Sequence, residues 1–243
     1  RSDWSSDVCS SDLALQALNQ PLERFVFLSS LSIFGAIREQ QPYKEIEPTD
    51  TPQPNTAYGK SKLEAEQLLP SSFPYIILRP TGVYGPREKD YFLMAKSIKG
   101  HSDFAVGYKQ QDITFVYVKD VVQATFLALD HGKIGSAYFL SDGKVYQSTT
   151  FSDLIHEELG RPWWIRVTAP IWVLRVVTFF GDLIGHATGK ISALNNDKYQ
   201  ILKQRNWRCN IRPAIEELGY KPEYDLQRGV KETIEWYKKE GWL

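Results

Sequence analysis

Short apolar runs alternate with amphipathic stretches along the first two thirds of the chain. The run from Phe25 to Ser29 is continuous and apolar, which is typical of a strand buried on both faces of a parallel sheet. Three later runs have the same character. The predicted strands are Phe25–Ser29, Tyr75–Leu78, Thr114–Val118 and Ala137–Leu140.

Helix-forming stretches separate these runs. Residues after position 56 are rich in Lys, Leu, Glu, Ala and Gln, which favour a helix that Asn55 or Thr56 can cap and that Pro70 ends. Asp120 opens another helix directly after a strand, and we interpret it as an N-cap worth about 1 kcal/mol. The helices predicted before residue 150 cover about 56–69, 90–99 and 120–129.

Strand–helix alternation at this spacing predicts an α/β fold with a doubly wound parallel sheet. From residue 150 onward helices dominate, and we expect a smaller, mostly helical lobe that binds the substrate. Its predicted helices cover 151–159, 170–186, 195–203, 213–218 and 226–239.

No glycine-rich turn that could hold a pyrophosphate follows any predicted strand. The clustered glycines Gly181, Gly185 and Gly189 lie near a helix end instead. We therefore expect the first βα units of the fold to be missing, a loss of about 100 residues at about 30 residues for each βαβ unit.

The segment Arg1–Leu13 is Ser-rich, with a near-repeat of Ser-Ser-Asp, and it resembles the in-frame translation of a sequencing adapter. We interpret residues 1–13 as an artefactual leader; a natural polar leader is the alternative. Cys209 is then the one remaining cysteine, which fits a reducing, cytoplasmic compartment. Four scattered histidines and no Cys-x-x-Cys motif predict no metal site.

The composition is that of a globular protein, with 42% hydrophobic and 24% charged residues. Twenty-nine basic residues balance 29 acidic ones, so no net field favours nucleic acid or an anionic membrane. We expect a small-molecule partner. The most apolar segment, Trp163–Ala187, is interrupted by Arg166, Arg175 and Asp182, and it predicts an amphipathic helix rather than a membrane span.

Tyr58 and Lys62 stand four residues apart on a predicted helix and therefore share one face. A nearby ammonium lowers the pKa of a phenol, so the pair suits proton exchange with a secondary alcohol. Ser29 and Ser30 end the first strand, at the carboxyl edge where open α/β sheets bind ligands. Their hydroxyls could hold a substrate oxygen or simply satisfy the end of the strand.

Four motifs occur in an order and spacing that resemble the extended short-chain dehydrogenase/reductase family. The resemblance extends to the tail and covers nearly all of residues 25–243. This family contains NAD-dependent epimerases and dehydratases of nucleotide sugars, and 3β-hydroxysteroid dehydrogenase-like enzymes. The motifs are FVFLSSLSIFG, TAYGKSK, ILRPTGVYGPR and TFVYVKDVVQA, and the tail is AIEELGYKPEYDLQRGVKETIEWY.

The resemblance implies a Rossmann-like NAD(P)-binding domain, of which residues 14–149 are the C-terminal part. Residues 150–243 would be the substrate-binding lobe. It also implies NAD or NADP as cofactor, without deciding between them. A homodimer and a peripheral contact with a membrane surface are both compatible with it.

The family's catalytic serine or threonine stands five residues before a glycine, here Gly35, which implies Ser30 as catalytic and substrate-binding residue beside Ser29. Tyr58 would be the general acid/base. Lys62 would hold the nicotinamide ribose and tune Tyr58.

Later motif residues receive roles by the same resemblance. Pro80 and Val83 would flank the carboxamide of the cofactor. Arg87 lies on a loop that often meets a charged substrate group, although a solvated loop arginine is the alternative.

The leading functional hypothesis is an NAD(P)-dependent oxidoreductase or epimerase acting on a secondary alcohol or ketone of a nucleoside-diphosphate sugar. One alternative is a 3β-hydroxysteroid dehydrogenase-like enzyme acting on an apolar alcohol, which the apolar surface of residues 163–187 favours. Another is a non-catalytic fragment of either, and we expect the chain alone to be inactive. A 4,6-dehydratase is disfavoured because Leu31-Ser32 follows Ser30, where those enzymes usually carry Asp-Glu.

The lobe contains candidates for substrate contact. Trp163, Trp164 and Trp172 are interpreted as core residues, with a pocket wall as the alternative. A nucleotide sugar needs donors for two phosphates. The available arginines are Arg166, Arg175, Arg205 and Arg208.

Overall fold

The computed structural model describes residues 22–188 and 196–243, so the predicted leader lies outside the described residues. The strands are β1 (Phe25–Leu28), β2 (Tyr75–Pro80), β3 (Gly82–Tyr84), β4 (Ser102–Val106), β5 (Phe115–Tyr117), β6 (Ala137–Leu140) and β7 (Ile165–Ala169). The helices are η1 (Leu31–Phe34), α2 (Ala57–Gln67), α3 (Lys89–Lys99), α4 (Val118–Asp130), α5 (Thr150–Glu158), α6 (Ile171–Thr188), α7 (Asn196–Lys203), α8 (Arg212–Leu218) and α9 (Leu226–Lys239).

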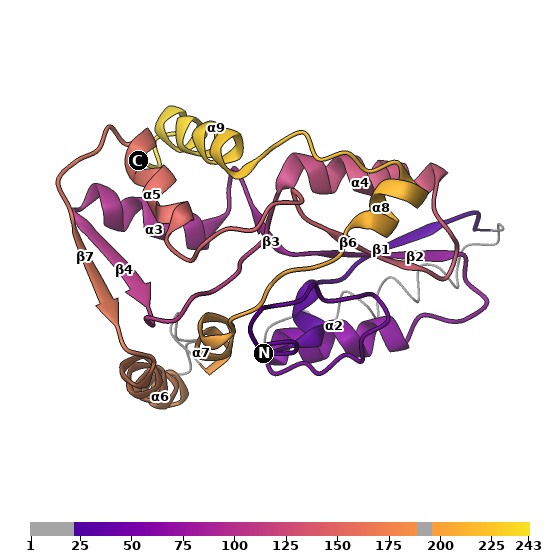
Figure 1. The fold of residues 1–243 in the computed structure, drawn as a ribbon, viewed down its shortest axis with the longest axis horizontal. Helices are drawn as coiled ribbons and strands as arrows, with labels where there is room; N and C mark the ends of the chain where they lie inside the picture. Colours follow the sequence, from indigo (N-terminus) through magenta and orange to yellow (C-terminus); the bar gives the residue numbers. More distant parts are fainter. Residues whose placement is uncertain (1–21, 189–195) are drawn as a thin grey trace.

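The central sheet has the order β1-β2-β6, and both neighbouring pairs are parallel. Helices α4 and α8 cover one face of this sheet, while α2 lies on the other (Figure 1). Parallel strands with helices on both faces confirm the predicted doubly wound α/β fold.

Two smaller parallel pairs, β3 with β5 and β4 with β7, extend the fold away from the central sheet. In Figure 1, β4 and β7 lie at the opposite end of the molecule from β1 and β2. Strands β3, β4 and β7 were not predicted from the sequence.

The molecule has two apolar cores. The first lies between the central sheet and its covering helices, and the second joins α3, α5 and α9. Leu140 and Leu218 share the first core, whereas Ala95 and Tyr237 share the second. Each core contains residues from both sides of residue 150, and the predicted division at that position stays a prediction.

Two assignments of burial and capping were wrong. Strand β1 forms one edge of the central sheet within the described residues, and Leu28 is 43% exposed rather than buried. Asp120 is buried in the first turn of α4 and does not cap it; the N-cap position is Tyr117. Its carboxylate accepts hydrogen bonds from the backbone N–H groups of Glu223 and Tyr224 at 3.0 and 3.1 Å, so it holds the segment that leads into α9.

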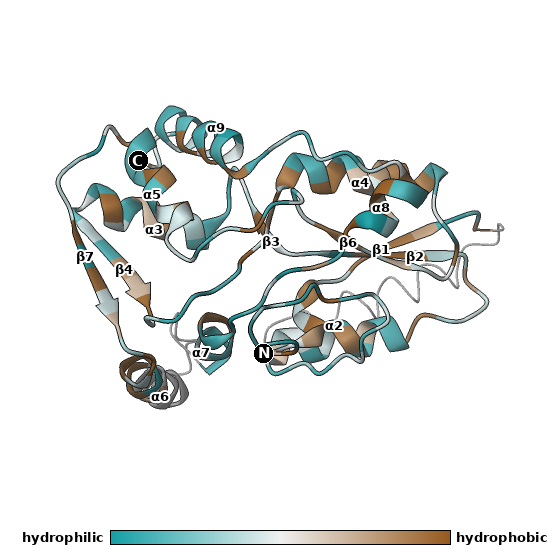
Figure 2. Cartoon of the chain, in the orientation of Figure 1, coloured by the Kyte–Doolittle hydropathy of each residue, from teal (hydrophilic) through white to brown (hydrophobic). Residues whose placement is uncertain are grey.

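Trp163, Trp164 and Trp172 were predicted to be core residues, and this prediction was wrong for two of them. Trp164 packs against the second core, but Trp163 and Trp172 are 69% and 68% exposed. Apolar colour is dense along α6, whereas α9 alternates between apolar and polar residues (Figure 2). None of the helices in residues 22–188 and 196–243 is both long and apolar enough to cross a membrane.

Candidate active site

The carboxyl ends of β1, β2 and β6 meet at one edge of the sheet, and a hydroxyl residue follows each strand. These residues are Ser29, Thr81 and Ser141, all buried. Ser141 Oγ accepts a hydrogen bond from Gly143 N at 3.1 Å. The hydroxyls of Ser29 and Thr81 have no hydrogen-bond partner among the described residues. Because an unpaired buried hydroxyl costs about 1–3 kcal/mol, this edge resembles a binding surface more than a finished core.

Ser30 begins the short helix η1 directly after this edge. Its Oγ accepts hydrogen bonds from Ser32 N at 3.2 Å and from Ser32 Oγ at 3.0 Å. The turn closes at Gly35, whose φ of 59° suits glycine. A Cβ at Gly35 would lie 2.2 Å from Gln53 O, so a larger residue would also push away the loop before α2.

Helix α2 positions Tyr58 and Lys62 against this turn. Thr56 caps the helix, as predicted, by accepting a hydrogen bond from Gly59 N at 2.9 Å. A Cβ at Gly59 would lie only 2.5 Å from Ser32 O. Glycine at this position therefore lets the first turn of α2 approach the turn that carries Ser30.

Tyr58 and Ser30 meet at this contact. Tyr58 is 40% exposed, but partial desolvation still raises the pKa of its phenol, while hydrogen bonding with Ser30 lowers it by a smaller amount. Lys62 Nζ lies 6.0 Å from the centre of the Tyr58 ring and donates to Leu28 O at 3.0 Å. Desolvation of the phenol is the largest influence on the Tyr58 pKa, and the lowering of this pKa by Lys62 stays a prediction.

The other predicted site residues are Pro80, Val83 and Arg87, which follow one another from the end of β2 to the loop before α3. Pro80 is buried and ends β2, and Val83 is half-buried in β3. Arg87 is exposed, with a φ of 71°, on the loop before α3. Their assigned roles stay predictions.

A buried ion pair behind the site was missed from the sequence. The guanidinium of Arg79 in β2 donates two hydrogen bonds to the carboxylate of Glu66 in α2. Nε donates to Oε1 at 2.9 Å, and Nη2 donates to Oε2 at 2.6 Å. The Arg79 guanidinium also lies 5.3 Å from the centre of the Phe34 ring in η1. It thus contacts both elements that carry catalytic candidates. An arginine within a buried strand signals such a partner, because a buried charge must be paired.

Three of the candidate phosphate-binding arginines are engaged by the protein itself. Arg166 pairs with Asp103 and Asp153 at 2.6 and 2.5 Å. Arg205 donates to Lys109 O at 3.1 Å. Arg208 lies 3.8 Å from the Glu45 carboxylate and 3.6 Å from that of Asp112.

Two hollows lie in the part of the molecule away from the central sheet. Between α6 and α7, the exposed Arg175 and Lys203 line a polar hollow of about 390 Å³. A second, mostly apolar cavity of about 260 Å³ lies among α3, β4, β5 and α7, and none of the described residues that line it is charged. Its lining includes Met94, Phe104 and Trp207.

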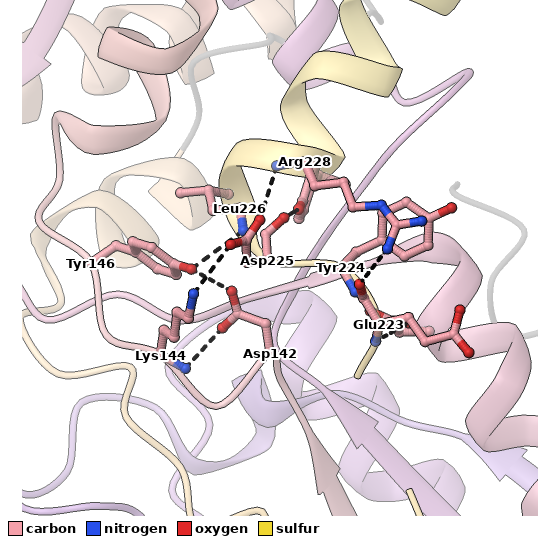
Figure 3. Close-up of polar contacts among 10 residues, drawn as sticks. Asp142, Lys144, Tyr146, Glu223, Tyr224, Asp225, Leu226 and Arg228 are labelled. Carbon is pink, nitrogen blue, oxygen red and sulfur yellow. Dashed lines mark hydrogen bonds and ion pairs between the residues drawn. The ribbon is translucent and has the colours of Figure 1, made fainter. Parts of the chain in front are cut away.

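A polar cluster connects the loop after β6 to the start of α9 (Figure 3). It consists of Asp142, Lys144, Tyr146, Asp225 and the backbone N–H of Leu226. Tyr146 donates to Asp142 at 2.5 Å and accepts from the backbone N–H of Leu226 at 3.3 Å. Lys144 pairs with Asp225, the N-cap of α9, at 3.2 Å. Burial raises the pKa of Asp142, and the Tyr146 hydrogen bond opposes that shift. Tyr146 and Leu226 both pack in the second core, so the cluster ties the loop after β6 to that core.

Residues 7–140 match the model of the NAD dependent epimerase/dehydratase family. The chain belongs to this family. The family that the motifs indicated is thereby confirmed.

Individual relatives agree with this assignment. The chain is 30% identical over 236 residues to a UDP-glucose 4-epimerase of Vibrio cholerae, an alignment covering 92% of this chain and 66% of that protein. It is 24% identical to a dTDP-D-glucose 4,6-dehydratase of Mus musculus, over 90% of this chain and 56% of that protein. The chain thus spans less than two thirds of the length of these curated relatives.

A solved structure supports the fold. The UDP-glucose 4-epimerase of Thermotoga maritima with UDP-glucose superposes with a TM-score of 0.72 at 21% identity, covering 98% of this chain and 72% of the other. At this level of identity the likeness concerns the fold alone.

Proposed function

We propose that the full-length protein is an NAD(P)-dependent oxidoreductase or epimerase acting on a secondary alcohol or ketone. The observation that carries this proposal is the meeting of Ser30, Tyr58 and Lys62 at the carboxyl edge of β1. Ser30 is close enough to Tyr58 to lower the pKa of its phenol, and Lys62 Nζ donates a hydrogen bond to Leu28 O, the last carbonyl of the strand. This is the edge at which open α/β sheets bind nucleotides.

The residues at this edge fit a nicotinamide nucleotide. Ser29 and Thr81 present buried hydroxyls without a partner in the described chain, and Lys62 adds a cationic donor beside them. Leu28, which is 43% exposed at the end of β1, supplies apolar surface of the kind that a nicotinamide ring requires. When bound, the nicotinamide supplies hydride transfer, and the choice between NAD and NADP stays open.

The side chains of the chain would handle the proton. In our proposal Ser30 Oγ holds the substrate oxygen, and Tyr58 Oη removes its proton as the alcohol is oxidised and returns it as the ketone is reduced. Because burial raises the pKa of Tyr58, its phenolate needs a nearby positive charge when the substrate is in place. Lys62, on the same helix face, is the residue that would provide it.

A nucleoside-diphosphate sugar is the substrate class that we propose first. The names of the relatives, a UDP-glucose 4-epimerase and a dTDP-D-glucose 4,6-dehydratase, support it. Arg166, Arg205 and Arg208 already bond to other residues of the chain. Arg175 and Lys203 are therefore the better candidates for contacts with the diphosphate.

An apolar alcohol is the second candidate, and one observation favours it. The cavity lined by Met94, Phe104 and Trp207 carries no charged residue and would accept an apolar group more readily than a diphosphate. This candidate corresponds to the 3β-hydroxysteroid dehydrogenase-like branch.

Assays of the full-length protein with two substrate panels separate the candidates. We expect epimerisation, or nicotinamide reduction, with at least one member of a UDP-sugar panel. A 3β-hydroxysteroid panel should give no reduction. Turnover of steroids with none of the sugars would replace the first substrate class with the second, and turnover of neither panel would contradict both.

A further inference from the structure

The first turn of α2 receives a contact from the distant helix α7. The Asp197 carboxylate accepts hydrogen bonds from Ala57 N at 3.1 Å and 2.9 Å, one to each oxygen, and from Tyr58 N at 3.3 Å. Asp197 lies in the first turn of α7, about 140 residues further along the chain.

This contact completes the cap of the helix that carries Tyr58. The first backbone N–H groups of an α-helix have no partner inside the helix. Thr56 Oγ1 takes the N–H of Gly59, and Asp197 takes those of Ala57 and Tyr58. A carboxylate at a helix N-terminus also interacts favourably with the helix dipole, and hydrogen bonds to an ionised acceptor are stronger than neutral ones.

The cap comes from an element that also borders both hollows of the lobe. Ile201 and Leu202 of α7 line the apolar cavity, and Lys203 lines the polar hollow against α6. Lys198 of the same helix forms an ion pair with Asp90 in α3. Helix α7 is therefore bonded to α3 through Lys198 and to the Tyr58 helix through Asp197.

We propose that Asp197 is a positioning residue, which fixes the backbone of Tyr58 relative to the substrate held beside α7. This inference rests on the function proposed above. An ordinary cap from residue 56 would hold α2 only to its own loop. By contrast, a cap from Asp197 makes the alignment of the phenol depend on where α7 lies. The reaction needs the phenol, Ser30 and the substrate oxygen in one geometry, and a displacement of about 1 Å can cost on the order of a hundredfold in rate.

Replacing Asp197 in the full-length protein tests the role. We expect Asp197→Ala to lower kcat by about tenfold to a hundredfold, with KM and cofactor affinity changed by less than about twofold. Asp197→Asn keeps one oxygen acceptor and should recover part of kcat. Hydrogen exchange at the amides of Ala57 and Tyr58 should accelerate in both variants, which can be measured without activity.

Lys198→Met is the matched control, because it cuts an attachment of α7 to α3 and leaves the α2 cap in place. Its kcat should stay within about twofold of the parent protein. The proposal is overturned if Asp197→Ala and Asp197→Asn keep the parent kcat, if KM changes in place of kcat, or if Lys198→Met causes an equal loss. Should Asp197→Ala fail to fold, the comparison of Asp197→Asn with Lys198→Met decides. If Tyr58→Phe also retains full activity, the proposed function fails instead.

Discussion

The environment of one phenol determines whether the proposed chemistry can work. Burial raises the pKa of Tyr58, and its hydrogen bond with Ser30 is the influence that opposes this. Ser30 thus has two proposed tasks, holding the substrate oxygen and making the phenolate easier to form. Both tasks can be tested with a single substitution.

Ser30→Ala should lower kcat by about tenfold to a hundredfold and shift its pH dependence. The lost hydrogen bond favours the phenolate, so its removal raises the Tyr58 pKa further. The base form then appears at higher pH, and the rising limb of kcat for alcohol oxidation moves upward in pH. The measurement is kcat against pH in the full-length protein.

Ser61→Ala provides the control for this prediction. Ser61 lies on the same helix, and its hydroxyl donates to the backbone carbonyl of Tyr58 at 2.9 Å without serving the phenol. Its pH profile should match that of the parent protein. If the rising limb of kcat against pH stays in place or moves to lower pH in Ser30→Ala, Ser30 does not assist the formation of the Tyr58 phenolate.

Local sequence pattern located some of these residues well and misjudged others. The helical spacing of Tyr58 and Lys62 and the strand end before Ser29 depend only on neighbouring residues, and in the structure Lys62 donates a hydrogen bond to Leu28 O at the end of that strand. Asp120 was misjudged because an aspartate after a strand predicts a cap, whereas its partners lie more than 100 residues away. Asp197 gave no local signal for the same reason.

At the scale of elements, the Arg79–Glu66 pair joins the Tyr58 helix to the central sheet. The two side chains are only 10% and 6% exposed. Removing one partner of such a pair leaves a buried charge without compensation, so Glu66→Ala should destabilise the fold by about 3–5 kcal/mol. Urea unfolding of the chain measures the change.

Two comparisons make this prediction specific. The double substitution Arg79→Met with Glu66→Met removes both charges and should recover much of the loss. Glu157→Ala cuts an exposed pair with Arg161, whose side chains are 71% and 47% exposed, and should cost less than about 1 kcal/mol. Equal losses for Glu66→Ala and Glu157→Ala would show that the buried pair has no special role.

Helices could be predicted from the sequence more readily than the short strands. The predicted ranges for α2, α5 and α9 agree with the structure to within about two residues, because propensity and capping signals extend over many positions. Strands β4 and β7 are five residues each and pair across about 60 positions of sequence. Their existence depends on that pairing, which no local pattern contains.

At the scale of the whole molecule, alternation of strands and helices sufficed to predict the doubly wound sheet, but not the distribution of helices between the two cores. Helix α8 follows residue 150 in sequence but packs on the central sheet, while α3 precedes residue 150 and packs with α5. The amphipathic pattern of a helix shows that one face is buried but not against which partner.

The substrate is also a property of the whole molecule. Sequence identified the arginines that could bind phosphate, and the structure shows three of them engaged by acidic side chains or a carbonyl. Which hollow receives the substrate depends on how α6 and α7 are placed relative to the sheet edge. Composition carries no information about that placement.

In the proposed reaction, Tyr58 carries the proton at the carboxyl edge of β1. Tyr58→Phe in the full-length protein removes the hydroxyl and keeps the ring, so kcat should fall by about a hundredfold to ten-thousandfold with little change in cofactor affinity. Lys62→Ala should weaken both turnover and cofactor binding. Near-normal kcat in Tyr58→Phe would contradict the account.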